Sequence, residues 1–163
     1  MSIQALLEQV TRDHFPNPPA TPAQLDEFER RVGWRLDPNL RAFYLHCNGA
    51  ELFERPNSPY RFLPLSGIIR ARIAIRGRDE DSRGPASWYV LCDVGDGNYV
   101  VVDTSDLKDG RYPLIDGYRE LFPDPEYCER IAGSFAELLD KALRSGGRHF
   151  WLLEEQHSGS TDD

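Results

Sequence analysis

The sequence contains little cysteine, and its three cysteines, Cys47, Cys92 and Cys128, are far apart along the chain. An odd number of scattered cysteines does not match a disulfide framework, and a structural zinc site needs close pairs of ligands. We therefore expect reduced, buried thiols. The four histidines are scattered as well, and no two of them stand four residues apart, so the helical histidine pair of a zinc hydrolase is absent.

Long apolar runs are also missing. No stretch approaches the roughly 18 consecutive apolar residues that suggest a membrane span. The first residues, MSIQALLEQVTRDHF, lack the basic start, the long apolar core and the small-residue cleavage site of a secretory signal. We therefore expect a cytoplasmic protein with no membrane partner.

Positive charge is in short supply. The chain has 19 lysines and arginines against 27 aspartates and glutamates, which gives a formal net charge of -8. A surface of this sign does not gather phosphates, so we expect no direct binding of nucleic acid. The charge favours a basic protein partner, although the same charge also simply keeps a protein soluble.

The length and composition match one ordinary domain. Of 163 residues, 40% are apolar and 28% are charged, which is enough to bury a single core. No internal repeat and no linker divides the chain. The sequence predicts one domain over residues 1–153 and a flexible tail at 154–163, EEQHSGSTDD, because polar chain ends usually stay solvated.

Apolar residues recur at helical spacing in four segments, which predicts four amphipathic helices. Their apolar stripes are Ile3, Leu6, Leu7 and Val10; Leu25, Phe28 and Val32; Leu40, Phe43, Tyr44 and Cys47; and Phe135, Leu138, Leu139 and Ala142. Capping signals precede three of these helices: Thr21 with Gln24, Asp37 with Pro38, and Ser134 with Glu137. Helix-ending signals follow at Gly33, at Asn48-Gly49 and at Gly146-Gly147.

Two runs rich in aromatic and β-branched residues, WYVLCD and YVVVD, flank the turn-forming residues 95–98. Such runs suit a buried sheet, and residues 95–98 can adopt the positive φ of a tight hairpin turn. Further strands are predicted at ELF, YRFLPL and RYPLI. The adjacent valines of VVV indicate a strand that is covered on both faces. Pro113 indicates that the RYPLI strand lies near an edge. Together these elements predict an α+β fold with an antiparallel meander flanked by helices.

The acidic residues of this hairpin raise the question of a bound ion or phosphate. A calcium loop beginning at Asp93 would need glycine at its sixth position and glutamate at its twelfth, where the sequence has Asn98 and Thr104. A dinucleotide fingerprint needs a third glycine and a following helix, whereas a strand is expected here. We interpret the segment as a turn and expect no catalytic residue, no cofactor and no metal.

A metal-dependent hydrolase that uses Asp93, Asp96 and Asp103 remains an alternative. It would require Asp93 and Asp103 to point to the same face of neighbouring strands. The sequence supplies no imidazole ligand beside these carboxylates.

An arginine-rich segment covers residues 70–83. Its five arginines form the one local concentration of positive charge, which could meet an acidic ligand. Three acids, Asp79, Glu80 and Asp81, stand among them. We interpret this mixed-charge segment, and the nearly apolar-free stretch 77–87, as solvated surface.

Three motifs in a fixed order resemble the SUKH superfamily, the group of cell-wall synthesis regulators and many bacterial toxin-immunity proteins. The resemblance runs from about Thr21 to Leu143. Its helix LRAFYLHCNGAEL, its hairpin WYVLCDVGDGNYVVVD and its last helix IAGSFAELLDKAL match the family's pattern. The matching positions are Phe43, Tyr44, Asn48 and Gly49; Asp93, Asp96 and Gly97; and Ser134 and Phe135.

The resemblance implies a non-catalytic protein-binding module on an antiparallel sheet packed with helices. Bacterial members bind and neutralise toxins such as nucleases or deaminases, which implies an immunity protein with a basic toxin domain as partner. A regulatory or scaffold module that binds host proteins is the alternative. We predict the contact residues Trp88, Tyr89, Asp93 and Asp96, although adjacent strand residues face opposite sides and one of the two rings is then expected in the core.

Overall fold

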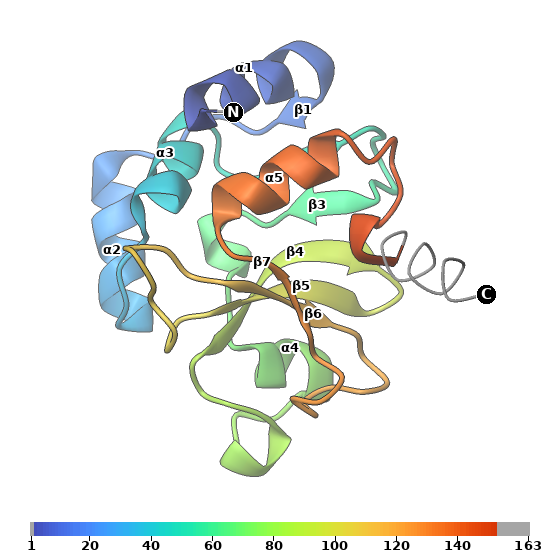
Figure 1. The fold of residues 1–163 in the computed structure, drawn as a ribbon. Coiled ribbons are helices and arrows are strands. Elements are labelled where there is room, and N and C mark those ends of the chain that lie inside the picture. Colours follow the sequence, from blue (N-terminus) through green and yellow to red (C-terminus); the bar gives the residue numbers. More distant parts are fainter. Residues whose placement is uncertain (1, 153–163) are drawn as a thin grey trace, which may run out of the picture.

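A seven-stranded antiparallel sheet, in which the spatial order of the strands equals their order in the chain, forms the centre of the structure (Figure 1). A computed structural model describes residues 2–152. The predicted tail at 154–163 and the domain limit at residue 153 lie outside the described residues. The strands are β1 (Phe15–Pro16), β2 (Ala50–Leu52), β3 (Tyr60–Phe62), β4 (Trp88–Gly95), β5 (Asn98–Asp103), β6 (Leu114–Gly117) and β7 (Arg130–Ala132).

Helices cover both sides of this sheet. They are α1 (Ile3–Asp13), α2 (Pro22–Val32), α3 (Pro38–His46), α4 (Ala71–Arg76) and α5 (Phe135–Leu143), with short 3₁₀ turns at Leu65–Gly67 and Asp81–Arg83. Figure 1 shows α1, α3 and α5 packed together on one side of the sheet and α4 on the other. The predicted α+β fold with an antiparallel meander is confirmed. No helix among residues 2–152 is long and apolar enough to cross a membrane.

The predicted caps begin the helices where the sequence indicated. The Thr21 hydroxyl accepts a hydrogen bond from the Gln24 amide at 3.1 Å, and the Gln24 side chain accepts one from the Thr21 amide at 2.8 Å. Together they satisfy two amides at the start of α2 that have no partner within the helix. Asp37 caps α3 and also accepts a bond from the Tyr112 amide at 3.2 Å, which ties this helix to the chain before β6.

The last capping signal differs in detail from the prediction. The Ser134 hydroxyl caps α5 through the Glu137 amide, as expected, but the Glu137 carboxylate accepts a bond from Gly133 rather than from Ser134. The third helix also ends one residue earlier than its apolar stripe suggests, because Cys47 is extended and only caps it.

The hairpin turn is confirmed. β4 and β5 pair from Trp88 opposite Asp103 to Gly95 opposite Asn98, and Asp96 and Gly97 between them have φ of 56° and 78°. Positive φ at both central residues is the geometry that matches the twist of two antiparallel strands. The acid and the glycine of this segment therefore have a structural reason to be where they are.

Both faces of the central strands are covered, as the VVV run predicted. The side chains of Val100, Val101 and Val102 are all fully buried. On one face, Phe135 of α5 lies 4.9 Å from Phe43 of α3, measured between ring centroids. This aromatic contact joins two helices over the sheet.

The sequence predicted one further feature of this fold and missed another. β6 lies next to the edge strand β7, so it is near an edge as predicted, although Pro113 stands just before the strand rather than in its ladder. The helix α4 was not expected, because six residues, ARIAIR, are too few to display a helical period.

The cysteines are free and buried, as predicted. Burial raises the pKa of the Cys47 thiol to about 12 and that of Cys128 to about 11, and it raises the pKa of Cys92 as well. These thiols stay protonated near neutral pH, so none of them is a nucleophile there.

Stability is expected to fall as the pH rises above 9. A thiol in the unfolded chain loses its proton near its ordinary pKa of 9.0, whereas folded Cys47 keeps its proton until about pH 12. The contribution of the protonated thiol to the free energy of unfolding is fully present below pH 9. It decreases between these two pH values, by about 1.4 kcal/mol per pH unit for each such thiol. Urea unfolding over this range measures the slope. Thiolate absorbance in the folded protein at about pH 10 would contradict the assignment.

Candidate protein-interaction surface

A groove of about 400 Å³ lies beside the tip of the β4–β5 hairpin. Three segments that are distant in the sequence line it: the hairpin at 94–98, the stretch 116–129 from β6 towards β7, and residues 149–152. Figure 1 shows the hairpin tip next to this last segment, at the red end of the described chain. We call this feature the hairpin groove.

Exposed apolar side chains gather in the hairpin groove. Among the described residues, eight large apolar side chains are exposed, and four of them line this groove. They are Tyr118, Leu121, Tyr127 and Leu152, with exposed fractions from 38% to 50%. Scattered apolar residues need no explanation, but a cluster beside polar groups marks an interaction site.

The position of Tyr118 follows from a close approach of two strands. Gly117 lies opposite Tyr99, and a Cβ at Gly117 would be only 2.7 Å from the Tyr99 carbonyl oxygen. The strand therefore ends with a residue that has no side chain, and Tyr118 emerges beside the hairpin tip. The Asn98 side chain accepts a bond from the Arg119 amide at 2.8 Å, which fixes the start of the connection to the turn.

Buried anchors hold the two other walls. Phe122 is 2% exposed, and its ring lies 6.0 Å from Trp88 between centroids, so the connection is fastened to β4. At the carboxyl end, the Tyr60 hydroxyl accepts a bond from the Phe150 amide at 3.2 Å and donates one to the Arg148 carbonyl. The adjoining Trp151 ring is stacked at 5.0 Å on His149.

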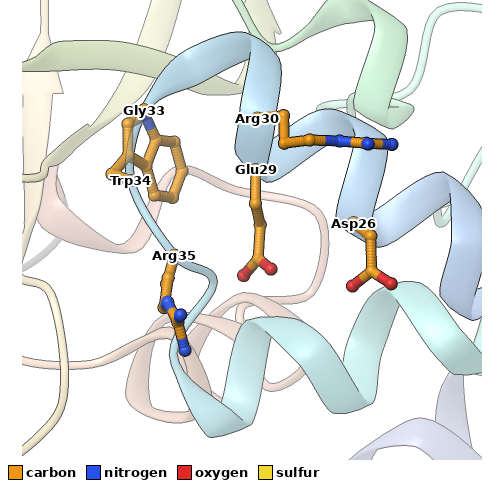
Figure 2. A pocket seen from close by; sticks show the side chains of 6 residues that line it. All are labelled: Asp26, Glu29, Arg30, Gly33, Trp34 and Arg35. Atoms are coloured by element: carbon orange, nitrogen blue, oxygen red, sulfur yellow. The ribbon is translucent and has the colours of Figure 1, made fainter.

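The hairpin groove differs from the other surface hollows in charge. Its lining includes Asp116 and Glu129 and, among the described residues, no lysine or arginine. Figure 2 shows the lining of a hollow beside α2, in which two acids and two arginines stand together. Its residues are Asp26, Glu29, Arg30, Gly33, Trp34 and Arg35. Three further hollows each contain at least one arginine.

The predicted contact residues have different positions. Trp88 and Tyr89 are 8% and 5% exposed, so both rings are buried, whereas the sequence predicted burial for one of them. They face opposite sides of a sheet that is covered on each side, with Trp88 against Phe122 and Tyr89 against Trp34. A role of these residues in binding stays a prediction, and their burial leaves little ring surface for a partner.

The two predicted acids stand at the hairpin tip. Asp93 pairs with Arg61 at 3.2 Å and accepts a bond from the Gly95 amide at 2.9 Å. Asp96 is exposed in the turn and lines two hollows that adjoin the hairpin groove. Of the four predicted residues, Asp96 is therefore the one whose side chain is most available, and its contact role also stays a prediction.

The three hairpin carboxylates cannot share one ion. Asp103 lies opposite Trp88, whereas Asp93 lies opposite Tyr99, so the two stand at opposite ends of the ribbon. Asp93 stands five positions after Trp88 along the strand, which corresponds to about 17 Å. Asp103 accepts bonds from the Ser105 amide and hydroxyl instead. No group of three metal-binding side chains occurs among the residues that the structure describes.

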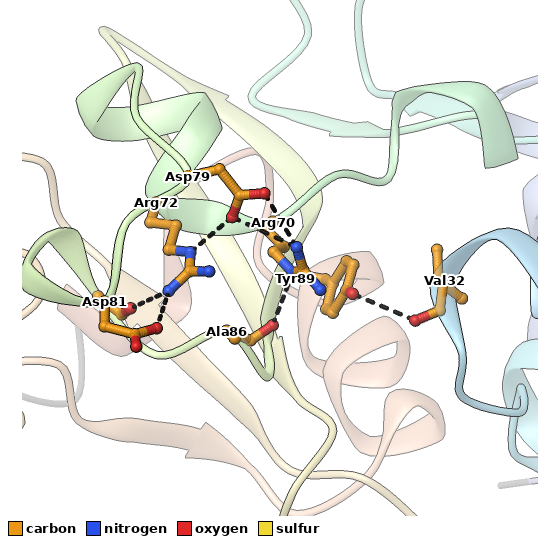
Figure 3. A network of polar contacts seen from close by, with 8 residues as sticks. Val32, Arg70, Arg72, Asp79, Asp81, Ala86 and Tyr89 are labelled. Carbon is orange, nitrogen blue, oxygen red and sulfur yellow. Dashed lines mark hydrogen bonds and ion pairs between the residues drawn. The ribbon is translucent and has the colours of Figure 1, made fainter.

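The side chains of the arginine-rich segment form hydrogen bonds within the protein, as Figure 3 shows. Arg72 is 6% exposed and donates to Asp79 at 2.8 Å, to Asp81 at 2.7 Å and to the Gly84 carbonyl. Its hydrogen bond to Asp79 lowers the pKa of that carboxyl group. Arg70 joins Asp79 to the Ala86 carbonyl. The interpretation as solvated surface is therefore wrong for Arg72, whose guanidinium holds the loop 79–86 against α4.

Sequence reasoning missed most of the hairpin groove. Tyr118, Leu121, Tyr127, Glu129, Trp151 and Leu152 were not among the predicted contact residues. One signal was present: the connection YRELFPDPEYCE carries several apolar and aromatic residues although its prolines make it irregular. Apolar residues in a loop have no core face to explain them, and this is a reason to look for a binding surface.

Comparison with known proteins adds two kinds of similarity. Residues 19–141 match the model of the SMI1 / KNR4 family (SUKH-1), so the match runs from before α2 into α5. The chain is 25% identical over 123 residues to the immunity protein YokJ of Bacillus subtilis (strain 168), covering 76% of this chain and 73% of YokJ. It is also 25% identical over 138 residues to the uncharacterized protein YnaB of the same organism, covering 85% of each.

Proposed function

Because this chain belongs to the SMI1 / KNR4 family (SUKH-1), we propose that it acts by binding another protein and not by catalysis. More specifically, we propose an immunity protein that neutralises a bacterial toxin domain, of nuclease or deaminase type, by covering its active site in the cytoplasm. The similarity to YokJ, which is named an immunity protein, supports this reading.

The observation that carries the proposal is the hairpin groove. A protein that inhibits by contact needs exposed apolar and aromatic anchors with polar groups at the rim. Half of the large exposed apolar side chains among the described residues lie in this one groove, beside Asp116 and Glu129. By contrast, the thiols are buried and protonated, and Asp103 stands at the opposite end of the hairpin from Asp93 and Asp96.

The net charge supports the type of partner. A formal charge of -8 attracts a basic protein such as a nuclease domain, whose own surface is built to bind phosphates. Opposite charges on the two proteins accelerate their encounter and disfavour other partners. Speed is useful to an inhibitor that must reach a toxin before the toxin reaches its substrate.

Co-expression with a toxin domain encoded next to this chain is expected to restore growth. The expected result is survival of cells that carry both proteins, and recovery of a complex from them on size-exclusion chromatography. The toxin with its catalytic residue replaced serves as the control, because it should bind equally and be harmless alone. A toxin that still kills and does not copurify with the full chain would contradict the immunity proposal.

A further inference from the structure

We propose that the hairpin groove receives an arginine side chain of the basic partner, whose guanidinium lies against the groove's aromatic rings and faces its carboxylates. This inference rests on the proposed function, because it names the chemistry by which a toxin domain would be recognised. It assigns the contact to Tyr118, Tyr127, Glu129 and Trp151.

The charge of the lining selects a cation. Glu129 is exposed, and Asp116 lies on the same lining. The hollow beside α2 also holds two acids, but Arg30 and Arg35 stand among them and offset their charge. Of the five hollows described, the hairpin groove alone combines carboxylates with a lining free of lysine and arginine among the described residues.

The aromatic lining favours arginine over lysine. Tyr118 and Tyr127 are 38% and 50% exposed, and the Trp151 ring is held in place by its stack on His149. A guanidinium is planar, sheds its water more readily than an ammonium group, and can lie flat on a ring while its edge donates to a carboxylate. Arginine and aromatic residues are also enriched together at the centres of protein interfaces.

Other occupants match the groove less well. Residues 153–163, which follow Leu152, include four carboxylate side chains and no lysine or arginine, so their charge repeats that of the groove. A nucleic acid would bring phosphates against Glu129. A second copy of the chain carries the same net charge of -8 and would be repelled at long range.

Three tryptophans make the test specific. In a spectrum of the ¹⁵N-labelled full chain, each indole N–H gives one signal: Trp151 from the hairpin groove, Trp34 from the hollow beside α2, and Trp88 from the core. Hexaarginine, hexalysine and hexaglutamate are the probes. We expect hexaarginine to shift the Trp151 signal to saturation, hexalysine to bind about threefold more weakly, and hexaglutamate to have no effect.

Two variants with matched controls locate the contact. Glu129→Lys is expected to weaken hexaarginine binding about tenfold or more, because it replaces the carboxylate that faces the guanidinium with a positive charge. Glu126→Lys makes the same change three residues away, at an exposed position outside the lining, and should stay within about twofold of the wild type. Tyr127→Ala is expected to weaken binding about fivefold, whereas Leu107→Ala removes an apolar side chain that is 57% exposed elsewhere and should have no effect.

Several results would overturn the inference. Equal shifts of Trp34 and Trp151 would show unspecific attraction, and equal binding of hexalysine would remove the preference for arginine. A Trp151 signal that moves with protein concentration alone would assign the groove to a second copy. A chain that rescues cells from the toxin but shows no Trp151 shift refutes only the groove assignment. A chain that binds hexaarginine but not the toxin refutes the immunity proposal.

Discussion

Replacing Gly49 by alanine is expected to lower the free energy of unfolding by about 3 kcal/mol or more, since strained backbone and steric overlap add at this position. Gly49 has φ of 92°, which an L side chain rarely adopts. A Cβ there would also lie 2.6 Å from the Phe62 carbonyl oxygen and 3.0 Å from the Pro64 nitrogen. Both atoms belong to the backbone, so neither can move aside without displacing the chain at the end of β3.

Gly33→Ala is the matched control for this effect. Gly33 ends α2 with φ of 80°, but no atom lies within 4 Å of the position that a Cβ would take. This variant therefore isolates the backbone cost, which is about 1 kcal/mol. Urea unfolding followed by tryptophan fluorescence measures both. If both variants lost the same free energy of unfolding, the close approach at Gly49 would not contribute to the loss of stability.

Replacing Phe43 by alanine is expected to lower the free energy of unfolding by about 4 kcal/mol. The variant loses the transfer free energy of the buried ring and also contains a cavity where the ring was. Phe43 is fully buried, and its ring lies 4.9 Å from Phe135, 5.0 Å from Tyr44 and 5.6 Å from Phe62 between centroids. Two other elements, α5 and β3, therefore lose a contact with α3 at once. A protein of ordinary stability has only about 5–15 kcal/mol in total.

Phe15→Ala provides the comparison for Phe43→Ala. Phe15 is 40% exposed at the edge strand β1, so removing its ring should cost less than about 1 kcal/mol. Denaturation in urea at a fixed temperature gives both values. If the two variants differed by less than about 1 kcal/mol, the aromatic cluster over the sheet would not be a main source of stability.

The sequence predicted those parts of the fold whose cause is local. The capping box at Thr21 and the hairpin turn at Asp96-Gly97 depend on residues within a few positions of one another, and both were found as expected. α4 and the pairing of β6 with β7 were missed for a different reason. A six-residue helix shows no periodicity, and the outer partner of β6 is a strand of only three residues, at 130–132.

The candidate site was less predictable than the fold because it is assembled from distant segments. Trp88 and Tyr89 are predicted contact residues because they are aromatic and precede an acidic turn. The sequence does not show that Phe122 and Trp34 cover them. Conversely, Trp151 follows the last predicted helix and gives no local signal that it meets the hairpin. Arg72 shows the same limit, since its burial depends on two acids of a loop that folds back on α4.

The order of the strands also matters during synthesis on the ribosome. Each new strand pairs with the one made just before it, so the sheet can grow in the direction of translation. The aromatic core cannot close in this way, because Phe135 arrives only with α5 and is the ring that contacts both Phe43 and Phe62. A nascent chain that stops before α5 thus has all seven strands, but only α1 and α3 cover the face on which α5 packs, and such exposed apolar surface is what chaperones and proteases recognise.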